Sequence, residues 1–485
     1  MTETKAVVIG AGIGGLALAI RLQTAGIATT IVEARDQPGG RAAFRRLEGY
    51  TFDTGPAAIA DPAPLTALWA LAGDDMAAAV TLLPVDPGYR CHWPDGAVLD
   101  LADDEALRAE IGRRAPGDAA GYRKLRDHAA ALRREGLDQP FADAAALLRA
   151  APWVVRHQAW RSVHSTVARF VGDEKLRQAL SFGTLLAGGN PMTANAAALR
   201  PGSEGEAWCV AGGTNRLIAA LAALFERRGG TIRLGDAAVR IETLGDRVTA
   251  VETASGWRTD CAMLGANCDM IHACRDLLAG SAAAARTAAR LERKRQAPSV
   301  FALHFGIKGT WPGIPHRTIL FGERYEEALS DTFGHGLLAA DFPLFLDHPS
   351  VTDPSLAPPG CSTFRAFALV PHLGKFPEDW RRIAPLIEQR VLDVLERRLI
   401  PEVRERIVTG FSYSPADFVG DFNAYLGSAF GPEPLPAEGT WFAARNRDAA
   451  IGNLYFVGAG AHPRGGWAGA LESAHSAADL MLGRG

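Results

Sequence analysis

Residues 6–24 decide the fold, and they read AVVIGAGIGGLALAIRLQT. The apolar run Ala6–Ile9 predicts a buried parallel strand, which leads directly into a glycine-rich turn. In that turn, Gly10 allows a tight bend, Gly12 lets the backbone approach a pyrophosphate, and Gly15 lets the next helix pack closely on the strand. The rest of the stretch predicts a helix whose N-terminal N–H groups and positive dipole end face the phosphates.

A carboxylate follows the next predicted strand. The run Thr29–Val32 ends at Glu33, whose side chain can accept hydrogen bonds from ribose hydroxyls. A glycine pattern alone recurs by chance in glycine-rich proteins, but this one lies between a strand and a helix and precedes the carboxylate at the expected place. The sequence therefore predicts a dinucleotide site that includes Gly10, Gly12, Gly14, Gly15 and Glu33.

A second glycine-containing element indicates which dinucleotide is bound. The segment Pro38-Gly39-Gly40-Arg41 permits another close backbone approach, and the Arg41 guanidinium can offset diphosphate charge. The segment FDTGP, residues 52–56, follows it. A nicotinamide dinucleotide does not need this second element, whereas the longer FAD does. We therefore expect FAD, bound in part by Gly40, Arg41, Gly55 and Pro56.

The end of the chain predicts a return to the same site. Asn453–Val457 is strand-like and leads into Gly458-Ala459-Gly460, and a helix is expected over residues 468–482. A helix that points its N-terminus at the flavin would stabilise negative charge on the reduced ring. We expect Gly458, Gly460 and Gly469 to contribute to the FAD site.

The middle of the chain predicts a further part of the nucleotide domain. An amphipathic helix that ends near Arg228 is followed by strand-like runs at residues 231–234, 238–241, 248–253 and 261–266. This pattern favours a return to the nucleotide domain, and Val239 is a candidate for backbone contact with the adenine.

Charge and cysteine content exclude several classes of function. The chain has 51 Lys and Arg against 54 Asp and Glu, a formal net charge of −3, which argues against a general nucleic-acid binder. The six cysteines form no C-x-x-C pair, so we expect reduced structural thiols of a cytoplasmic protein and no metal site. The apolar runs are shorter than the roughly 18 residues of a membrane-spanning helix, and we expect no signal peptide before the first strand.

Two domains are expected, because 485 residues are too many for one core. The predicted fold class is α/β, a Rossmann-like FAD-binding domain with an inserted α+β domain for the substrate. The FAD-binding domain is predicted to comprise residues 1–90, 206–276 and 441–485. The substrate domain is predicted to comprise residues 91–205 and 277–440.

The two insertions differ in character. The first is helix-rich, with helices expected over residues 104–114, 119–134 and 152–171. The second begins with a helix and continues with strands expected at residues 299–307, 318–321 and 362–370.

The last helix of the first insertion has two interpretations. Trp153 and Trp160 are seven residues apart, which would place them on one face of a helix, and three arginines lie nearby. Such a helix can lie in the interface of a bilayer. Alternatively, it is a domain-surface helix whose tryptophans pack inward.

Taken together, the chain resembles the bacterial-type phytoene desaturases of the flavin amine-oxidase superfamily, almost from end to end. FAD motifs are shared across that superfamily, so the matches outside them are the specific ones. They are LRAAP at 148–152, QAWRSV at 158–163, GGNP at 188–191, VTDPSLAP at 351–358, NAY at 423–425 and GSAF at 427–430, with HP at 462–463.

The resemblance implies an FAD-dependent desaturase of carotenoid biosynthesis that acts on phytoene or a related polyene precursor by hydride transfer to flavin. It also implies peripheral association with the inner face of the cell membrane, and reoxidation by a quinone or by oxygen. The residues themselves identify no catalytic base. Two alternatives stay open: another flavin oxidoreductase or isomerase of the superfamily, such as an amine oxidase or a carotenoid isomerase, and a non-catalytic lipid-binding relative.

The chain departs from the family pattern in three places. After His462-Pro463 it has Arg464 and Trp467, a larger cation and an indole near the expected flavin edge, where they could reshape the substrate tunnel. Glu472 replaces a glycine of the family in the next helix. The segment Trp208–Gly213 lacks the aromatic-proline-basic lead-in that the family has before its paired glycines. These departures bear on the substrate and the number of steps more than on the fold.

Overall fold

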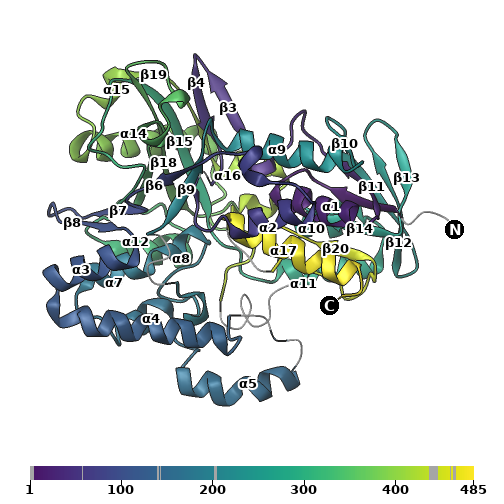
Figure 1. The fold of residues 1–485 in the computed structure, drawn as a ribbon, viewed down its shortest axis with the longest axis horizontal. Helices are drawn as coiled ribbons and strands as arrows, with labels where there is room; N and C mark the ends of the chain where they lie inside the picture. The colour runs from purple at the N-terminus through teal and green to yellow at the C-terminus, as the bar shows by residue number, and fades with distance from the viewer. Residues whose placement is uncertain are drawn as a thin grey trace.

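The glycine-rich turn follows the central strand of a five-stranded parallel sheet. The computed structural model describes residues 5–56, 58–138, 141, 144–200, 205–435, 446–458, 460–462 and 466–484. In sheet order the strands are β10 (Thr231–Arg233), β2 (Ala28–Val32), β1 (Lys5–Ile9), β14 (Met263–Ala266) and β20 (Leu454–Phe456). Segments far apart in the sequence therefore lie side by side, as β14 and β20 do in Figure 1. The α/β class is confirmed, and so are these strands within two residues at each end.

Side chains of β1 alternate between two hydrophobic cores. Ala6 and Val8 belong to one core, and Val7 and Ile9 belong to the other. Successive side chains of a strand point to opposite faces of the sheet. Both faces are covered here, which explains why the strand reads as a continuous apolar run.

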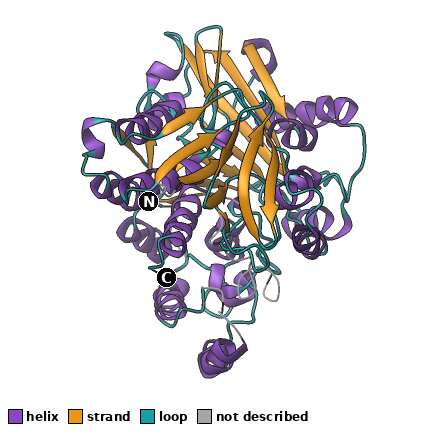
Figure 2. Cartoon of the chain, turned by 90° about the vertical axis from the view of Figure 1, so that its right-hand side faces the viewer, coloured by secondary structure: helices purple, strands orange, loops and turns teal. Residues whose placement is uncertain are grey.

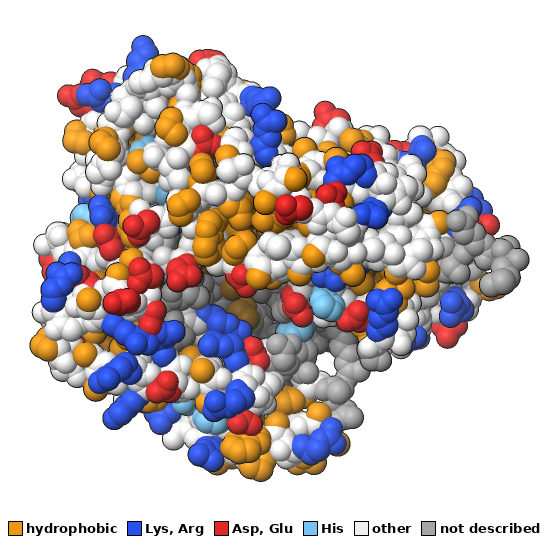
Figure 3. Space-filling view, in the orientation of Figure 1, with side chains coloured by type: hydrophobic (Ala, Val, Ile, Leu, Met, Phe, Trp, Pro, Cys, Tyr) orange, Lys and Arg blue, Asp and Glu red, His pale blue; other side chains and the backbone are white. Residues whose placement is uncertain are grey.

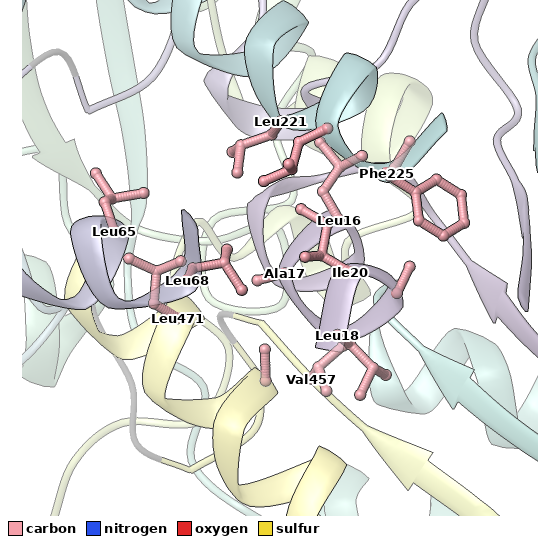
Figure 4. Close-up of a cluster of buried hydrophobic side chains, with 14 of the residues drawn as sticks. Leu16, Ala17, Leu18, Ile20, Leu65, Leu68, Leu221, Phe225, Val457 and Leu471 are labelled. Carbon is pink, nitrogen blue, oxygen red and sulfur yellow. The ribbon is translucent and has the colours of Figure 1, made fainter. Parts of the chain in front are cut away.

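Helix α1 (Ile13–Thr24) lies at the centre of the first core. It packs against α9 (Thr214–Arg227), α2 (Ala63–Leu71) and α17 (Gly466–Met481). Figure 4 shows Leu16 and Ile20 of α1 among side chains from these helices. Each fully buried Leu or Ile contributes about 1.5–3 kcal/mol to folding, so this packing fixes the start of α1 against the sheet.

The opposite face of the parallel sheet is covered by α11 (Ala282–Glu292) and by a small antiparallel sheet. That sheet comprises β11 (Ala238–Leu244), β12 (Arg247–Thr253) and β13 (Arg258–Asp260).

A second large sheet has seven strands and is mostly antiparallel. In order they are β19 (Ile407–Tyr413), β15 (Ser299–Lys308), β18 (Cys361–Val370), β17 (Leu344–Asp347), β16 (Arg317–Leu320), β7 (Tyr89–His92) and β8 (Val98–Leu101). Helix α14 (Trp380–Arg398) packs on one face. The strands that the sequence predicted in the second insertion are confirmed as β15, β16 and β18.

The other face of this sheet meets the helical insertion. Helices α3 (Asp104–Arg114) and α4 (Ala119–Arg134) have the predicted bounds. The single helix predicted over residues 152–171 is wrong. Helix α5 (Ala144–His157) ends before Gln158, whose φ of 49° lies outside the helical region, and α6 (Val163–Val167) begins after Ser162 caps it. Helices α7 (Glu174–Ser181) and α8 (Gly183–Leu186) follow.

Shorter elements join these layers. The strands are β3 (Phe44–Leu47), β4 (Tyr50–Asp53), β5 (Ala58–Ile59), β6 (Leu82–Val85) and β9 (Ala207–Val210). The helices are α10 (Met270–His272), α12 (Tyr325–Leu329), α13 (Pro349–Thr352), α15 (Val403–Arg406) and α16 (Pro415–Phe422). Figure 2 shows the strands at the centre of the molecule and the helices outside them.

The domain boundaries stay a prediction. Strand β7 crosses the predicted boundary at residue 90, and it pairs with β16 of the second insertion. Among the described residues, none of the helices is both long enough and apolar enough to cross a membrane. All six cysteines are free thiols.

Candidate cofactor site

The first glycine-rich turn is built so closely that side chains have no room in it. A Cβ on Gly15 would lie far inside van der Waals contact with the carbonyl oxygen of Gly10, so α1 and β1 meet backbone to backbone. Gly10 has a φ of +97°, which disfavours any other residue. These are the close packing and the tight bend that the sequence predicted.

The start of α1 is open toward a ligand. Gly12 is its N-cap, and no side chain of the described residues caps the helix there. The first backbone N–H groups of a helix lack intrahelical partners, so this end attracts anions. The N–H of Ala11, just before the helix, donates to Glu33 Oε2 at 2.7 Å. Glu33 is buried and also accepts from the N–H of Arg35 at 3.0 Å, so the carboxylate is fixed at the edge of the sheet.

The second glycine element adjoins the first. The N–H of Gly39 donates to the carbonyl of Ala11 at 2.9 Å, and Gly12 and Gly39 form an isolated parallel bridge. A Cβ on Gly40 would lie 3.3 Å from the Cα of Gly12. The two turns therefore form one continuous strip of backbone, as a ligand with two phosphates and a long ring system requires.

Gly55 and Arg41 are packed against each other. A Cβ on Gly55 would clash with the carbonyl oxygen of Arg41. The guanidinium of Arg41 donates from Nη1 to the carbonyl of Ala429 at 2.6 Å. Burial lowers the pKa of Arg41, and the nearby Asp269 carboxylate opposes that shift. An arginine guanidinium stays charged in proteins, so Arg41 places a positive charge at the contact between the glycine strip and the second insertion.

Asn267 lies at the centre of this arrangement, and sequence reasoning missed it. It directly follows β14, and its Nδ2 donates to the carbonyl of Val457 at 3.1 Å. A Cβ on Gly12 would lie 2.7 Å from its Oδ1, and a Cβ on Gly14 would lie 2.9 Å from its Nδ2. The signal was present, because ligands of open α/β sheets bind at the carboxyl ends of the strands and β14 was predicted to end one residue before Asn267.

The end of the chain closes the arrangement. Gly458 has a φ of +90°, and its N–H donates to Ser473 Oγ of α17 at 2.9 Å. Gly460 lies two residues further along the chain, and Gly469 is buried near the start of α17. Ala459 lies outside the described residues.

Val239 lies near the opposite end of the strip. It is the extra residue of a bulge in β11, and its side chain is about half exposed. The N–H of Asp236, three residues earlier, donates to the carbonyl of Glu33 at 2.9 Å. Val239 is therefore on the Glu33 side of the site, where an adenosine would lie, and its contact with adenine stays a prediction.

The residues of the three departures from the family can be located, except Arg464. Trp467 is buried in the core around α1, and its Nε1–H donates to the carbonyl of Pro56 at 2.8 Å. Its indole therefore holds the Gly55–Pro56 turn. Glu472 is exposed on α17. Arg464 lies outside the described residues. In the third departure, β9 occupies part of Trp208–Gly213, and the N–H of Gly212 donates to Asp353 Oδ2 at 2.6 Å.

These residues fit FAD. The uncapped start of α1 and the glycine strip suit a diphosphate, and Glu33 suits a ribose. The individual contacts of Gly10, Gly12, Gly14, Gly15, Glu33, Gly40, Arg41, Gly55, Pro56, Val239, Gly458, Gly460 and Gly469 with FAD stay predictions.

Comparison with known proteins identifies the class of protein to which the chain belongs. The family described as flavin containing amine oxidoreductase matches residues 13–482, so the chain belongs to that family and is an FAD-dependent oxidoreductase. The fold agrees, because an oxidoreductase from Methanosarcina mazei superposes with a TM-score of 0.65 at 17% identity, over 98% of this chain and 99% of that one.

Within that family, the chain belongs to the phytoene desaturases. It is 46% identical to a lycopene-forming phytoene desaturase of Paracoccus sp., over 98% of this chain and 97% of that protein. It is 45% identical to a lycopene-forming phytoene desaturase of Pseudescherichia vulneris, over 99% of both chains. The resemblance that the sequence motifs indicated is therefore confirmed.

Proposed function

We propose that this protein introduces double bonds into phytoene, with lycopene as the end product. The observation that carries the proposal is the 46% identity to a lycopene-forming desaturase over nearly the whole chain, including the substrate part. Identity confined to the glycine turns would support FAD binding alone, because fold and cofactor motif do not determine the substrate.

In this reaction the protein binds and orients FAD and the polyene, and it excludes water from them. FAD, when bound, supplies a two-electron acceptor for the hydrogen removed from the carbon chain. An apolar polyene offers no polar group to recognise, so its binding depends on apolar surface. Partly buried hydrophobic side chains pack at the join between the seven-stranded sheet and the helical insertion. They include Leu186, Met192, Val300, Phe367 and Phe430.

We propose that α5 brings the protein to a membrane surface, where such a substrate resides. Its inner side packs through Ala150 and Val154, and its outer side exposes Leu148 (73%) and Trp153 (38%). Trp160, just beyond the helix, is 51% exposed. The interpretation in which both tryptophans pack inward does not fit these exposures.

Basic groups accompany the apolar side chains of α5. Arg149 and Arg156 are exposed on it, and the Arg156 guanidinium lies 5.6 Å from the centre of the Trp153 ring. Figure 3 shows hydrophobic and basic side chains together along the lower edge, where α5 lies in Figure 1. Aromatic and basic groups on one exposed face are typical of helices that lie in the interface of a bilayer. We propose the inner face of the cell membrane as that surface.

The electron acceptor completes the proposal. Each new double bond removes two hydrogens, and the two electrons must leave the protein before another turnover. We propose a membrane quinone or oxygen as the acceptor, and a membrane-bound protein has access to both.

Reconstitution tests the function. Purified protein, FAD and a quinone are added to liposomes that contain phytoene, and the extracted pigment is analysed by absorption spectroscopy and chromatography. We expect the long-wavelength, fine-structured absorption of lycopene. To distinguish quinone from oxygen as the electron acceptor, the reaction is run under argon without the quinone, and air is then admitted.

A matched variant shows whether the pigment is formed by the purified protein or was carried over from the expression host. Glu33→Ala removes the carboxylate proposed for the ribose and should lower the rate at least about tenfold at limiting FAD. If the wild-type protein holds FAD and leaves phytoene colourless, the proposed substrate is wrong. If it binds polyene without FAD, a lipid-binding role replaces the enzymatic one.

A further inference from the structure

A row of polar side chains crosses the seven-stranded sheet. Arg317 of β16 is opposite Asp347 of β17, Asp347 is opposite Arg365 of β18, and Arg365 is opposite His304 of β15. Residues that are directly opposite in neighbouring strands project from the same face. That face meets β4, because the His304 ring lies edge-on to the ring of Phe52 at 6.5 Å.

The row contains a buried ion pair. Arg365 Nε donates to Asp347 Oδ2 at 2.9 Å, and Arg365 Nη2 donates to the same oxygen. The two side chains are 14% and 7% exposed. Desolvation offsets much of the attraction within such a pair, so burying it does little for stability by itself. The ion pair lies where the seven-stranded sheet meets β4, and a gain in stability does not explain why it is buried there.

The remaining arm of the guanidinium leaves the sheet. Arg365 Nη1 donates to the carbonyl of Gly55, across 310 residues of sequence. The next carbonyl, that of Pro56, accepts from Trp467 at 2.8 Å. The Gly55–Pro56 turn is thus held by the sheet through Arg365 and by α17 through Trp467.

We propose that Arg365 is a positioning residue for FAD, oriented and neutralised by Asp347. It fixes the Gly55–Pro56 turn relative to the sheet on which the substrate part of the protein is built. Arginine suits this task, because its rigid planar fork binds a carboxylate with two N–H groups and keeps a third for the carbonyl. The inference rests on the proposed contact of Gly55 and Pro56 with FAD.

The test removes the contact with Gly55 without leaving one member of the ion pair unpaired. The double variant Asp347→Leu/Arg365→Met replaces the pair by apolar side chains of similar size, a change that is often neutral for stability. The matched control is Arg90→Met/Asp100→Leu in the same sheet. Arg90 and Asp100 are also opposite each other, on β7 and β8, with Nε and Oδ1 2.7 Å apart.

Two measurements test whether Arg365 positions the Gly55–Pro56 turn for FAD. The first is the dissociation constant of FAD from the deflavinated protein, followed by flavin fluorescence. The second is hydrogen exchange of the peptide that covers residues 52–58, measured in the FAD-free protein. For the Asp347→Leu/Arg365→Met variant we expect an FAD dissociation constant raised about tenfold, faster exchange in that peptide, and a melting temperature near that of the wild type. The Arg90→Met/Asp100→Leu control should change neither the dissociation constant nor the exchange.

Single variants keep the inference testable if the double variant fails to fold. Asp347→Asn keeps Arg365 but removes the charge that orients it, and should raise the dissociation constant about threefold. Arg365→Lys keeps the charge without the fork, and should bind FAD less tightly than the wild type. Wild-type affinity and wild-type exchange in these variants would overturn the inference. A wild-type protein that does not bind FAD would instead overturn the proposed cofactor site, and the exchange measurement would still report on the Arg365 contact.

Discussion

Asn267 and the glycines around it illustrate what single residues decide in this protein. Three backbone segments, from β1, β14 and β20, meet around one side-chain amide, and the glycines leave the space that this amide fills. Packing of this density tolerates no added methyl group, because protein interiors are filled like crystals. Loss of the turn would also misplace the uncapped start of α1, which is the proposed diphosphate site.

Gly15→Ala should destabilise the protein by about 3 kcal/mol and abolish FAD binding. The added Cβ collides with the Gly10 carbonyl, so either α1 or β1 must move. Chemical denaturation and FAD titration measure the two effects. Gly112→Ala is the control, because Gly112 is exposed in α3 and a Cβ there meets nothing within 4 Å. It should stabilise the protein by up to about 1 kcal/mol. Equal effects of the two substitutions would contradict this account of the turn.

At the scale of elements, the local sequence pattern of α5 predicted a helix, whereas the tertiary context decided where that helix ends. The sequence predicted one helix that carries both tryptophans, but α5 ends at His157, where the chain turns at Gln158. Trp153 and Trp160 therefore do not share one helix, although both are exposed. The apolar side chains reach the surface because the core beneath α5 is small and is filled by Ala150 and Val154 with their neighbours.

Leu148→Ser should weaken binding to lipid vesicles about fivefold to tenfold, because the variant loses apolar surface that enters the bilayer interface. Leu244→Ser is the matched control. Leu244 is 78% exposed against 73% for Leu148, but it lies at the end of β11, away from α5 (Figure 1). Vesicle flotation at several lipid concentrations gives the partition coefficients. Equal losses in the two variants would show that α5 is not the membrane contact.

At the scale of the whole molecule, buried histidines make stability depend on pH. Burial lowers the pKa of His128, His316, His348 and His372 to about 4 in each case. In the unfolded chain these groups titrate near the ordinary histidine value of about 6.5. Between these values the unfolded chain binds more protons than the folded protein, so stability falls as pH falls.

We therefore expect the melting temperature to drop by at least about 5 °C between about pH 7 and about pH 5. The change comes before most carboxylates titrate, so histidine is its main source in this window. His128→Leu should flatten the dependence, because it removes a half-buried imidazole that packs near Phe170. A melting temperature that is constant across this range would refute the expectation.

The sequence by itself determined the strand–turn–helix start, the cofactor FAD and the family. These features depend on short-range pattern: a buried strand, glycines at fixed spacing and a carboxylate after the next strand are adjacent in the chain. The tertiary structure alone decided that Asn267 fills the glycine turn, that α5 ends before Trp160, and that Arg365 reaches Gly55 across 310 residues. Such contacts depend on which strands become neighbours in a sheet. Local periodicity does not specify that order, because it reports which side of a strand is buried but not what covers it.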